Sequence, residues 1–169
     1  MIPRKYTSGA IGLVISIFAM TVGGCYSFTG SSVPAHLKTV AIPLFEDVSG
    51  FGEAGLSEQV TQALIQLFIN DNSLEIADRQ TSDSIIEGTI TSVNDVPSVI
   101  APGEQVTTRR VTVTVHASFT DLKFKKKMWD KDFSNWGEYD QGSETRTVAL
   151  DEAIRKVTED ILLETVSGW

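Results

Sequence analysis

The strongest constraint on the fold is the segment 107–119, in which apolar and polar residues alternate strictly from Val111 onwards. Its apolar positions are Val111, Val113, Val115, Ala117 and Phe119. Every residue between them is polar, so the pattern has the two-residue period of a strand. Successive side chains of a strand point to opposite faces of the sheet, which predicts one buried and one open face.

The rest of the chain predicts two amphipathic helices and four further strands. The helical period is carried by Leu56, Val60, Ala63, Leu64 and Leu67, and later by Leu150, Ile154, Val157 and Ile161. Asp151 and Glu152 are expected in the first turn of the second helix. The other strands are expected at 37–45, 74–76, 84–93 and 128–136, the last joined to 107–119 by a hairpin. This order predicts an α+β fold, a two-layer sandwich with two helices packed on one face of a four- to five-stranded mixed β-sheet.

The N-terminal 24 residues have the layout of an export signal. Arg4 and Lys5 precede an apolar run at 10–20, which is shorter than the ~20 residues that a membrane-spanning helix needs. The segment ends Val22-Gly23-Gly24-Cys25, which resembles the bacterial lipobox. The resemblance implies a covalent diacylglycerol and an N-linked acyl chain on Cys25, and two or more chains anchor a protein firmly. The alternative is a free thiol beside an ordinary cleavage site.

These features predict three parts: a lipoprotein signal peptide at 1–24, a lipidated tether at 25–35 and a single domain at 36–169. Removal of residues 1–24 leaves 145 residues with a formal charge of −10. This charge argues against nucleic acid as a partner, because no excess of cations is present to neutralise phosphates. Tyr26, where an Asp would stand in inner-membrane lipoproteins of enteric bacteria, favours the periplasmic side of the outer membrane by resemblance.

Several segments of the mature chain carry a family resemblance. They are Cys25 to Ser32, Leu37 to Phe45, Leu56 with its helix, Glu87 to Ile90, and Trp129 to Trp136. With them the chain resembles the LptE family, outer-membrane lipoproteins of lipopolysaccharide assembly, in its divergent branch from Bacteroidetes and Chlorobi-type bacteria. The resemblance implies two helices on a sheet and two partners. One is the β-barrel translocon LptD, whose lumen the family member plugs, and the other is lipopolysaccharide, bound through its phosphates and acyl region.

Two basic clusters are candidate contacts for lipopolysaccharide. The first is the hairpin with Lys123, Lys125, Lys126 and Lys127, followed by Lys131, and the second is Arg109 and Arg110. Ammonium and guanidinium groups suit phosphates. The alternative for the lysines is a solvated turn that discourages aggregation. The alternative for the arginines is pairing with acids such as Glu104.

Apolar side chains give two further contact candidates. Residues 95–103 carry Val96, Val99 and Ile100 between prolines, which suits either insertion against a partner or a connection folded onto its own core. Trp129, Phe133 and Trp136 form the second candidate. The first two of these aromatic residues share one strand face, which favours the core.

The sequence offers little chemistry for catalysis or metal binding. One cysteine excludes an intrachain disulfide and multi-cysteine metal sites, and two histidines, His36 and His116, leave little for a histidine site. No nucleophile elbow, HExxH or phosphate-binding loop is present. We therefore expect a non-enzymatic protein without a cofactor. The alternative is a periplasmic-facing regulatory or scaffold lipoprotein that modulates a cell-wall enzyme or secretion complex, since 37–45 and its following helix are similar to the opening unit of TolB- and CsgG-like envelope domains.

Overall fold

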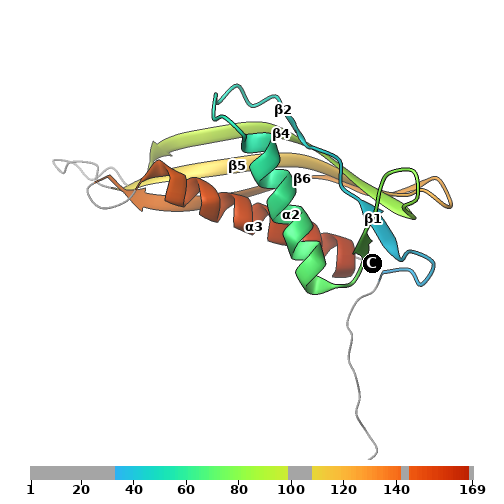
Figure 1. Ribbon diagram of the computed structural model, residues 1–169. Coiled ribbons are helices and arrows are strands. Elements are labelled where there is room, and N and C mark those ends of the chain that lie inside the picture. The colour runs from blue at the N-terminus through green and yellow to red at the C-terminus, as the bar shows by residue number, and fades with distance from the viewer. Residues whose placement is uncertain (1–32, 99–107, 142–144, 168–169) are drawn as a thin grey trace, which may run out of the picture. The chain divides into compact units, whose positions relative to one another are not determined.

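Two helices lie on one side of a mixed sheet in the computed structural model, which describes residues 33–98, 108–141 and 145–167 (Figure 1). The elements are β1 (Thr39–Ala41), β2 (Glu46–Asp47), α2 (Leu56–Asp71), β3 (Glu75–Ile76), β4 (Ser84–Pro97), β5 (Thr108–Asp121), β6 (Lys126–Asp140) and α3 (Arg146–Ser167). All of them belong to one compact unit, Ser31–Trp169. No helix within the described ranges is both long and apolar enough to cross a membrane. Residues 1–32, including Cys25, lie outside the described residues.

The sheet has six strands and is mixed, as predicted, but it is one strand larger than the expected four or five. The strands run in the order β3-β1-β4-β5-β6, with β2 paired to β4. β1 lies parallel to β3 and β4, whereas β4, β5 and β6 are antiparallel. The additional strand is β2, which lies just beyond the expected strand 37–45, and only 39–41 of that expected strand forms β1. Pro43 lies between β1 and β2 and cannot donate a ladder hydrogen bond.

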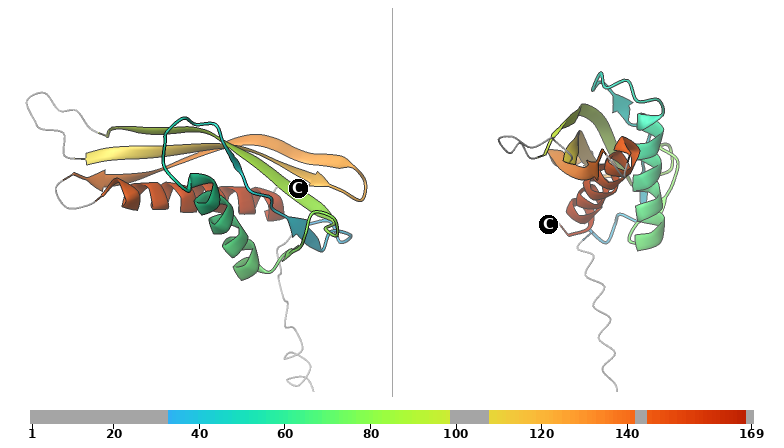
Figure 2. Two further views of the ribbon diagram at one scale, coloured as in Figure 1. Left: turned by 45° about the horizontal axis from the view of Figure 1, so that its top comes forward. Right: turned by 90° about the vertical axis from the view of Figure 1, so that its left-hand side faces the viewer.

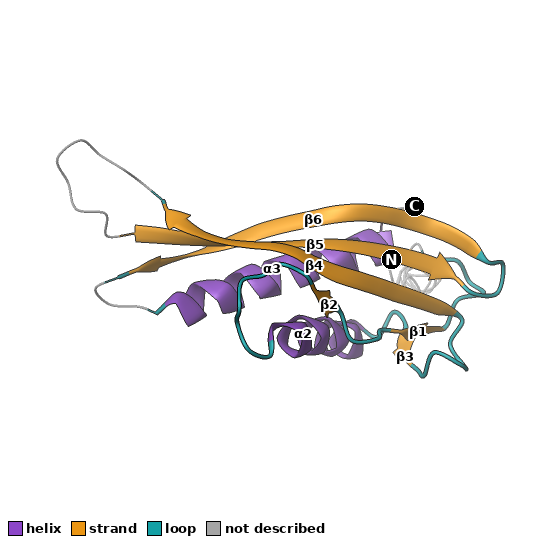
Figure 3. Cartoon of the chain, turned by 90° about the horizontal axis from the view of Figure 1, so that it is seen from above, coloured by secondary structure: helices purple, strands orange, loops and turns teal. Residues whose placement is uncertain are grey.

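The alternation in β5 is confirmed. Val111, Val113 and Val115 are fully buried, while Thr112 and Thr114 lie on the opposite face and stay partly exposed. The long strands β4, β5 and β6 lie side by side in Figure 3. Both helices lie on the same side of them, as the end-on view of Figure 2 shows. Burial of each large apolar side chain on the helix-facing side contributes roughly 1.5–3 kcal/mol.

The helix ends show one confirmed boundary and one correction. Asn72 caps α2 in the left-handed conformation and donates its N–H to the Phe68 carbonyl at 2.9 Å, which agrees with the expected stop. α3 begins at Arg146, more than one turn before the expected start. Asp151 and Glu152 therefore lie beyond the first turn, so their predicted role at the helix N-terminus is wrong.

The C-terminal part of edge strand β6 is sealed by polar side chains. The Lys156 ammonium of α3 donates to the Trp136 carbonyl at 2.9 Å, and Asn135 accepts from the Trp136 N–H at 2.9 Å. Glu152 accepts a further hydrogen bond from the Glu138 backbone and pairs with Lys156 at 2.8 Å. Backbone groups that would otherwise offer an edge to another strand are thereby satisfied.

Sheet and helix approach each other closely at Gly137 of β6. A Cβ atom there would lie 2.2 Å from the carbonyl oxygen of Ala149 in α3 and 2.9 Å from its Cα. Both atoms belong to backbone, so no flexible side chain can move aside. Gly137 therefore sets how closely α3 approaches the edge of the sheet.

We expect Gly137→Ala to destabilise the fold by about 1–3 kcal/mol, because the added methyl group forces α3 and β6 apart. Urea unfolding followed by circular dichroism measures the loss. Ser134→Ala, on the exposed face of the same strand, is the matched control and should change stability by less than about 0.5 kcal/mol. Equal effects for the two variants would contradict this account of the contact.

Candidate functional site

The six basic residues proposed from the sequence do not form one site. Arg109 and Arg110 lie at the start of β5, whereas the four lysines lie at and beyond its end, around the turn into β6. A strand rises ~3.3 Å per residue, so the two groups are roughly 40 Å apart. Each group therefore has to be assessed separately.

Both arginines pair with acidic side chains, which is the type of contact that the alternative interpretation expected. Arg109 donates to the Asp95 carboxylate at 2.8 Å and to the Asp95 carbonyl at 2.9 Å. The Asp95 carboxylate raises the pKa of Arg109 and also accepts the Tyr139 hydroxyl at 3.0 Å. Glu104, the partner named from the sequence, lies outside the described residues.

Arg110 has a similar structural role at the exposed end of the sheet. It pairs with Glu138 at 2.9 Å and lies over the Trp136 ring, 4.0 Å from its centroid. Ser98 and then Arg110 hold the pKa of Glu138 below its ordinary value through hydrogen bonds. A guanidinium with a carboxylate on one side and an aromatic ring on the other has little capacity left for an external phosphate.

The β5–β6 turn is built on the buried carboxylate of Asp121. One oxygen of this carboxylate accepts the Phe124 N–H at 2.9 Å, and the other lies 2.6 Å from His36 Nε2. Burial raises the pKa of Asp121, but the hydrogen bonds from His36 and from the Phe124 N–H outweigh it and lower the pKa. Lys125 completes the turn with a φ of 51°, in the left-handed region. The Asp121 carboxylate therefore stabilises the turn from its buried side.

Two of the four hairpin lysines are tied to acids. Lys123 pairs with Asp83 at 2.9 Å and donates to the His36 carbonyl at 2.7 Å. Asp83 also accepts the Lys38 N–H at 2.8 Å, and its pKa is lowered first by Lys123 and then by this N–H. Lys127 pairs with Asp130. Lys123 therefore joins the hairpin to the start of β1, and Lys127 stabilises β6.

The remaining residues of the turn form the hairpin tip, defined as Phe124, Lys125 and Lys126. Phe124 is 69% exposed, the largest exposed fraction among the described large apolar side chains. Lys125 and Lys126 are exposed and have no ion-pair partner in residues 33–98, 108–141 and 145–167. Two unpaired ammonium groups beside an open aromatic ring suit an amphiphilic anion.

Sequence reasoning found these lysines but missed Phe124 and the support from His36. Phe124 lies inside the basic run. An aromatic residue in an otherwise polar hairpin turn was the sequence feature that could have indicated a contact residue. His36, considered only as metal-binding material, packs its ring 4.5 Å from that of Phe124. Lys131, also named with the hairpin, pairs with Glu164 of α3.

The aromatic candidates divide between core and surface. Trp129 is 7% exposed and Phe133 packs partly buried beside it with ring centroids 5.5 Å apart, which confirms the core interpretation for both. Trp136 is 39% exposed. In the 95–103 segment, Val96 is 48% exposed, whereas Val99 and Ile100 lie outside the described residues.

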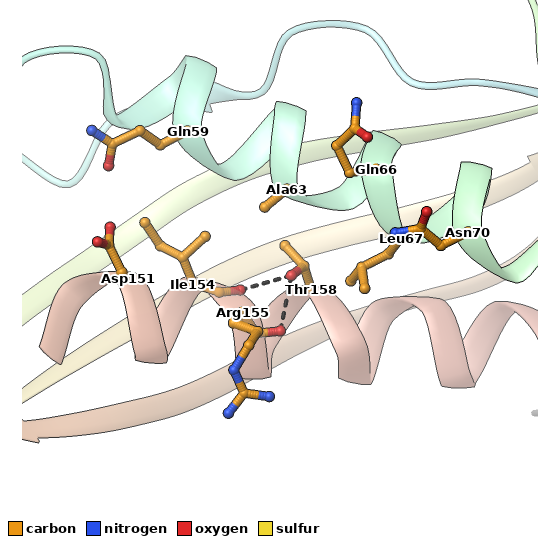
Figure 4. A pocket seen from close by; sticks show the side chains of 9 residues that line it. All are labelled: Gln59, Ala63, Gln66, Leu67, Asn70, Asp151, Ile154, Arg155 and Thr158. Carbon is orange, nitrogen blue, oxygen red and sulfur yellow. Dashed lines mark hydrogen bonds between the residues drawn. The ribbon is translucent and has the colours of Figure 1, made fainter. Parts of the chain in front are cut away.

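Two shallow cavities lie on the described surface. One, of about 350 Å³, lies between α2 and α3, where Ala63, Leu67 and Ile154 line the gap and Gln59 and Asn70 lie at its edge (Figure 4). The other, of about 320 Å³, includes Leu44, the Arg79–Glu87 ion pair and His116 among its lining residues.

Neither cavity brings a catalytic set together. The two ring nitrogens of His116 lie 2.8 Å from Asp130 and 2.8 Å from Asp132, so the imidazole is held on both sides. Within the ranges described, no group of three or more His, Cys, Asp or Glu side chains could hold a metal ion.

The fold defines a two-layer α+β domain, and comparison with known proteins identifies its family. Residues 37–165 match the LptE family, described as lipopolysaccharide-assembly. The match covers more than half of the chain, from before β1 to the last turns of α3. The chain belongs to the LptE family, a family of non-enzymatic lipoproteins, as the sequence resemblance indicated. No curated protein matches the chain.

Solved structures share this fold at low sequence identity. A protein from Xanthomonas campestris is 12% identical with a TM-score of 0.57, and the alignment covers 82% of this chain and 94% of that one. A subunit of the PelC dodecamer from Paraburkholderia phytofirmans is 10% identical with a TM-score of 0.55, over 81% and 94%. A protein from Chlamydia trachomatis is 6% identical with a TM-score of 0.56, over 76% and 98%. At such identities the likeness concerns the fold alone.

The carboxylate of Asp83 makes the hairpin attachment sensitive to acid. Its pKa is lowered in the folded protein, so its contribution to stability is present above the ordinary value of 3.8 and is lost as pH falls through the folded pKa. Between about pH 6 and about pH 3, the unfolding free energy should therefore fall more for the wild type than for Asp83→Asn. Urea unfolding at several pH values measures the two slopes. Parallel slopes would show that Asp83 gains nothing from Lys123.

Proposed function

We propose that this protein is a non-enzymatic outer-membrane lipoprotein that assists lipopolysaccharide assembly as the plug and partner of an LptD-type β-barrel. The observation that carries the proposal is the LptE family match over residues 37–165, which includes every described strand, α2 and all but the last two residues of α3. The family is described by its part in lipopolysaccharide assembly. We propose in addition that the protein lies in the outer membrane and plugs the barrel that is its partner.

The proposed anchor is Cys25, on the periplasmic side of the outer membrane. Its support is the sequence Val22-Gly23-Gly24-Cys25 after a short apolar run, and the presence of only one cysteine in the chain. Cleavage of the peptide bond before the lipidated Cys25 would remove residues 1–24 and leave the domain on the tether 25–35. A body with a formal charge of −10 gains no attraction to anionic lipid from its overall charge, so acyl chains would have to supply the attachment.

The proposed lipopolysaccharide contacts are narrower than the six residues named from the sequence. Lys125 and Lys126 are the two whose ammonium groups the described residues leave without an acidic partner. Arg109, Arg110, Lys123 and Lys127 are each paired with a carboxylate. An anionic ligand would have to displace these partners, which makes the paired residues poorer phosphate ligands.

The barrel partnership is tested by affinity purification of the full chain from detergent-solubilised outer membranes. We expect a large β-barrel protein of the LptD type to co-purify, identified by mass spectrometry. Intact mass of the purified protein shows at the same time whether Cys25 carries diacylglycerol and an N-acyl chain. Recovery of a cell-wall enzyme or secretion complex in place of the barrel would favour the regulatory or scaffold alternative.

The lysine contacts are tested with the double variant Lys125→Asn and Lys126→Gln. Asn is chosen because it tolerates the left-handed conformation of residue 125. Each exposed charge pair contributes about 0.2–1 kcal/mol, so lipopolysaccharide affinity should fall roughly two- to thirty-fold and depend less on salt.

Lys131→Gln is the matched control, because its ammonium is already paired with Glu164. Binding of labelled lipopolysaccharide by full-length protein in detergent provides the measurement. Unchanged affinity and salt dependence in the double variant would remove the hairpin tip from the binding site.

A further inference from the structure

The hairpin tip lies beside the point where the described chain begins. His36, four residues into the described chain, packs its ring against Phe124 with centroids 4.5 Å apart. Its carbonyl accepts from Lys123 at 2.7 Å, and its Nε2 lies 2.6 Å from Asp121. In the left view of Figure 2 the β5–β6 turn and the first segment of the described chain lie at the same end of the sheet.

The length of chain before His36 limits how far this end can lie from the proposed anchor. Eleven residue steps separate Cys25 from His36. A fully extended chain spans at most ~3.3–3.6 Å per residue, so the tether reaches roughly 40 Å at most. Acyl chains on Cys25 would therefore keep the hairpin tip within reach of the bilayer surface, at a distance of roughly 40 Å or less.

The chemistry of the hairpin tip matches that surface. Phe124 presents an open aromatic ring, and aromatic and long apolar side chains partition to the boundary between headgroups and acyl chains. Lys125 and Lys126 place two positive charges beside this ring on an otherwise acidic protein. The nearby carboxylates of Asp83 and Asp130 are paired with Lys123 and Lys127, so they do not cancel these two charges. The third carboxylate, Asp121, is buried and lies against His36 and the Phe124 N–H.

The turn is also preorganised for such a contact. Asp121 fixes the Phe124 N–H from below, and the His36 ring supports one side of the phenyl ring. Less conformational freedom is then lost when the tip meets a surface. An exposed aromatic ring that is held in place by buried polar bonds is more useful for contact than for folding.

We propose that the hairpin tip is a second membrane contact, in which Phe124 lies at the headgroup–acyl boundary of the phospholipid leaflet that holds the anchor and Lys125 and Lys126 contact its phosphates. The inference rests on the proposed acylation of Cys25 and goes beyond it, because a lipid anchor on a tether leaves the domain free to rotate. A contact by the hairpin tip fixes which end of the sheet faces the bilayer.

The test places an environment-sensitive NBD label on Phe124→Cys in the full-length, acylated protein. Acylation blocks the thiol of Cys25, so the introduced cysteine is the one reactive thiol of the chain. The protein is reconstituted into vesicles of phosphatidylethanolamine and phosphatidylglycerol without lipopolysaccharide. We expect a blue shift of NBD emission and quenching by lipids spin-labelled near the headgroup.

Val148→Cys is the matched control. Val148 is also exposed, at 50%, but lies at the start of α3, at the far end of β6 from the hairpin tip. Its label should keep the emission of a water-exposed probe. Adding Lys125→Asn and Lys126→Gln to the Phe124→Cys variant should weaken the contact equilibrium roughly tenfold to thirtyfold, and high salt should act in the same direction.

The outcomes separate this inference from the proposed anchor. If the protein floats with the vesicles and carries acyl chains, but the label at 124 stays aqueous, the membrane contact is overturned and the anchor stands. If the label shifts only when lipopolysaccharide is added, the tip recognises that glycolipid and the phospholipid contact is equally overturned. If the wild-type protein lacks acyl chains and behaves as Cys25→Ser in flotation, the anchor fails and the inference fails with it.

Discussion

The one-sided hydrophobic face of the central strands determines the rest of the architecture. Val111, Val113 and Val115 bury one face of β5, so both helices must lie on that side and the other face stays polar. The close backbone contact between Gly137 and Ala149 then brings α3 against the edge strand. With the layers fixed in this way, functional side chains can lie only at the ends of the long hairpins, on the open face or in the gap between the helices.

The sequence pattern predicted the layers because they depend on periodicity. The alternation around Val113 and the helical stripe that includes Ile154 both belong to buried faces, and their partners can be inferred without knowing distances. The strand break at Pro43 and the early start of α3 depend on local backbone geometry, which periodicity does not report. Phe68 illustrates the same limit, since it is fully buried on α2 beside the predicted Leu67, which is only partly buried.

The sequence predicted which basic residues gather at the candidate site, but not which acidic residues pair with them. A basic hairpin on an acidic chain is visible in the sequence, but the partners of its lysines are not. Lys127 pairs with Asp130, three residues on in the same strand, whereas Lys123 pairs with Asp83, which lies just before β4 and far from it in the sequence. The same long-range pairing occupies Arg109 and Arg110. The structure therefore reduces six candidate cations to Lys125 and Lys126 and adds Phe124, whose backbone N–H donates to Asp121.

The sealed edge of β6 has a consequence for assembly. Glu152, Asn135 and Lys156 already satisfy the outward backbone groups around Trp136 and Glu138, so another chain gains few main-chain hydrogen bonds there. Copies of the protein are thereby discouraged from joining into a continuous sheet through this segment. A partner that binds this part of the edge has to recognise side chains and shape. The side chains that determine the specificity of such binding can change without disturbing the hydrogen bonds of the sheet.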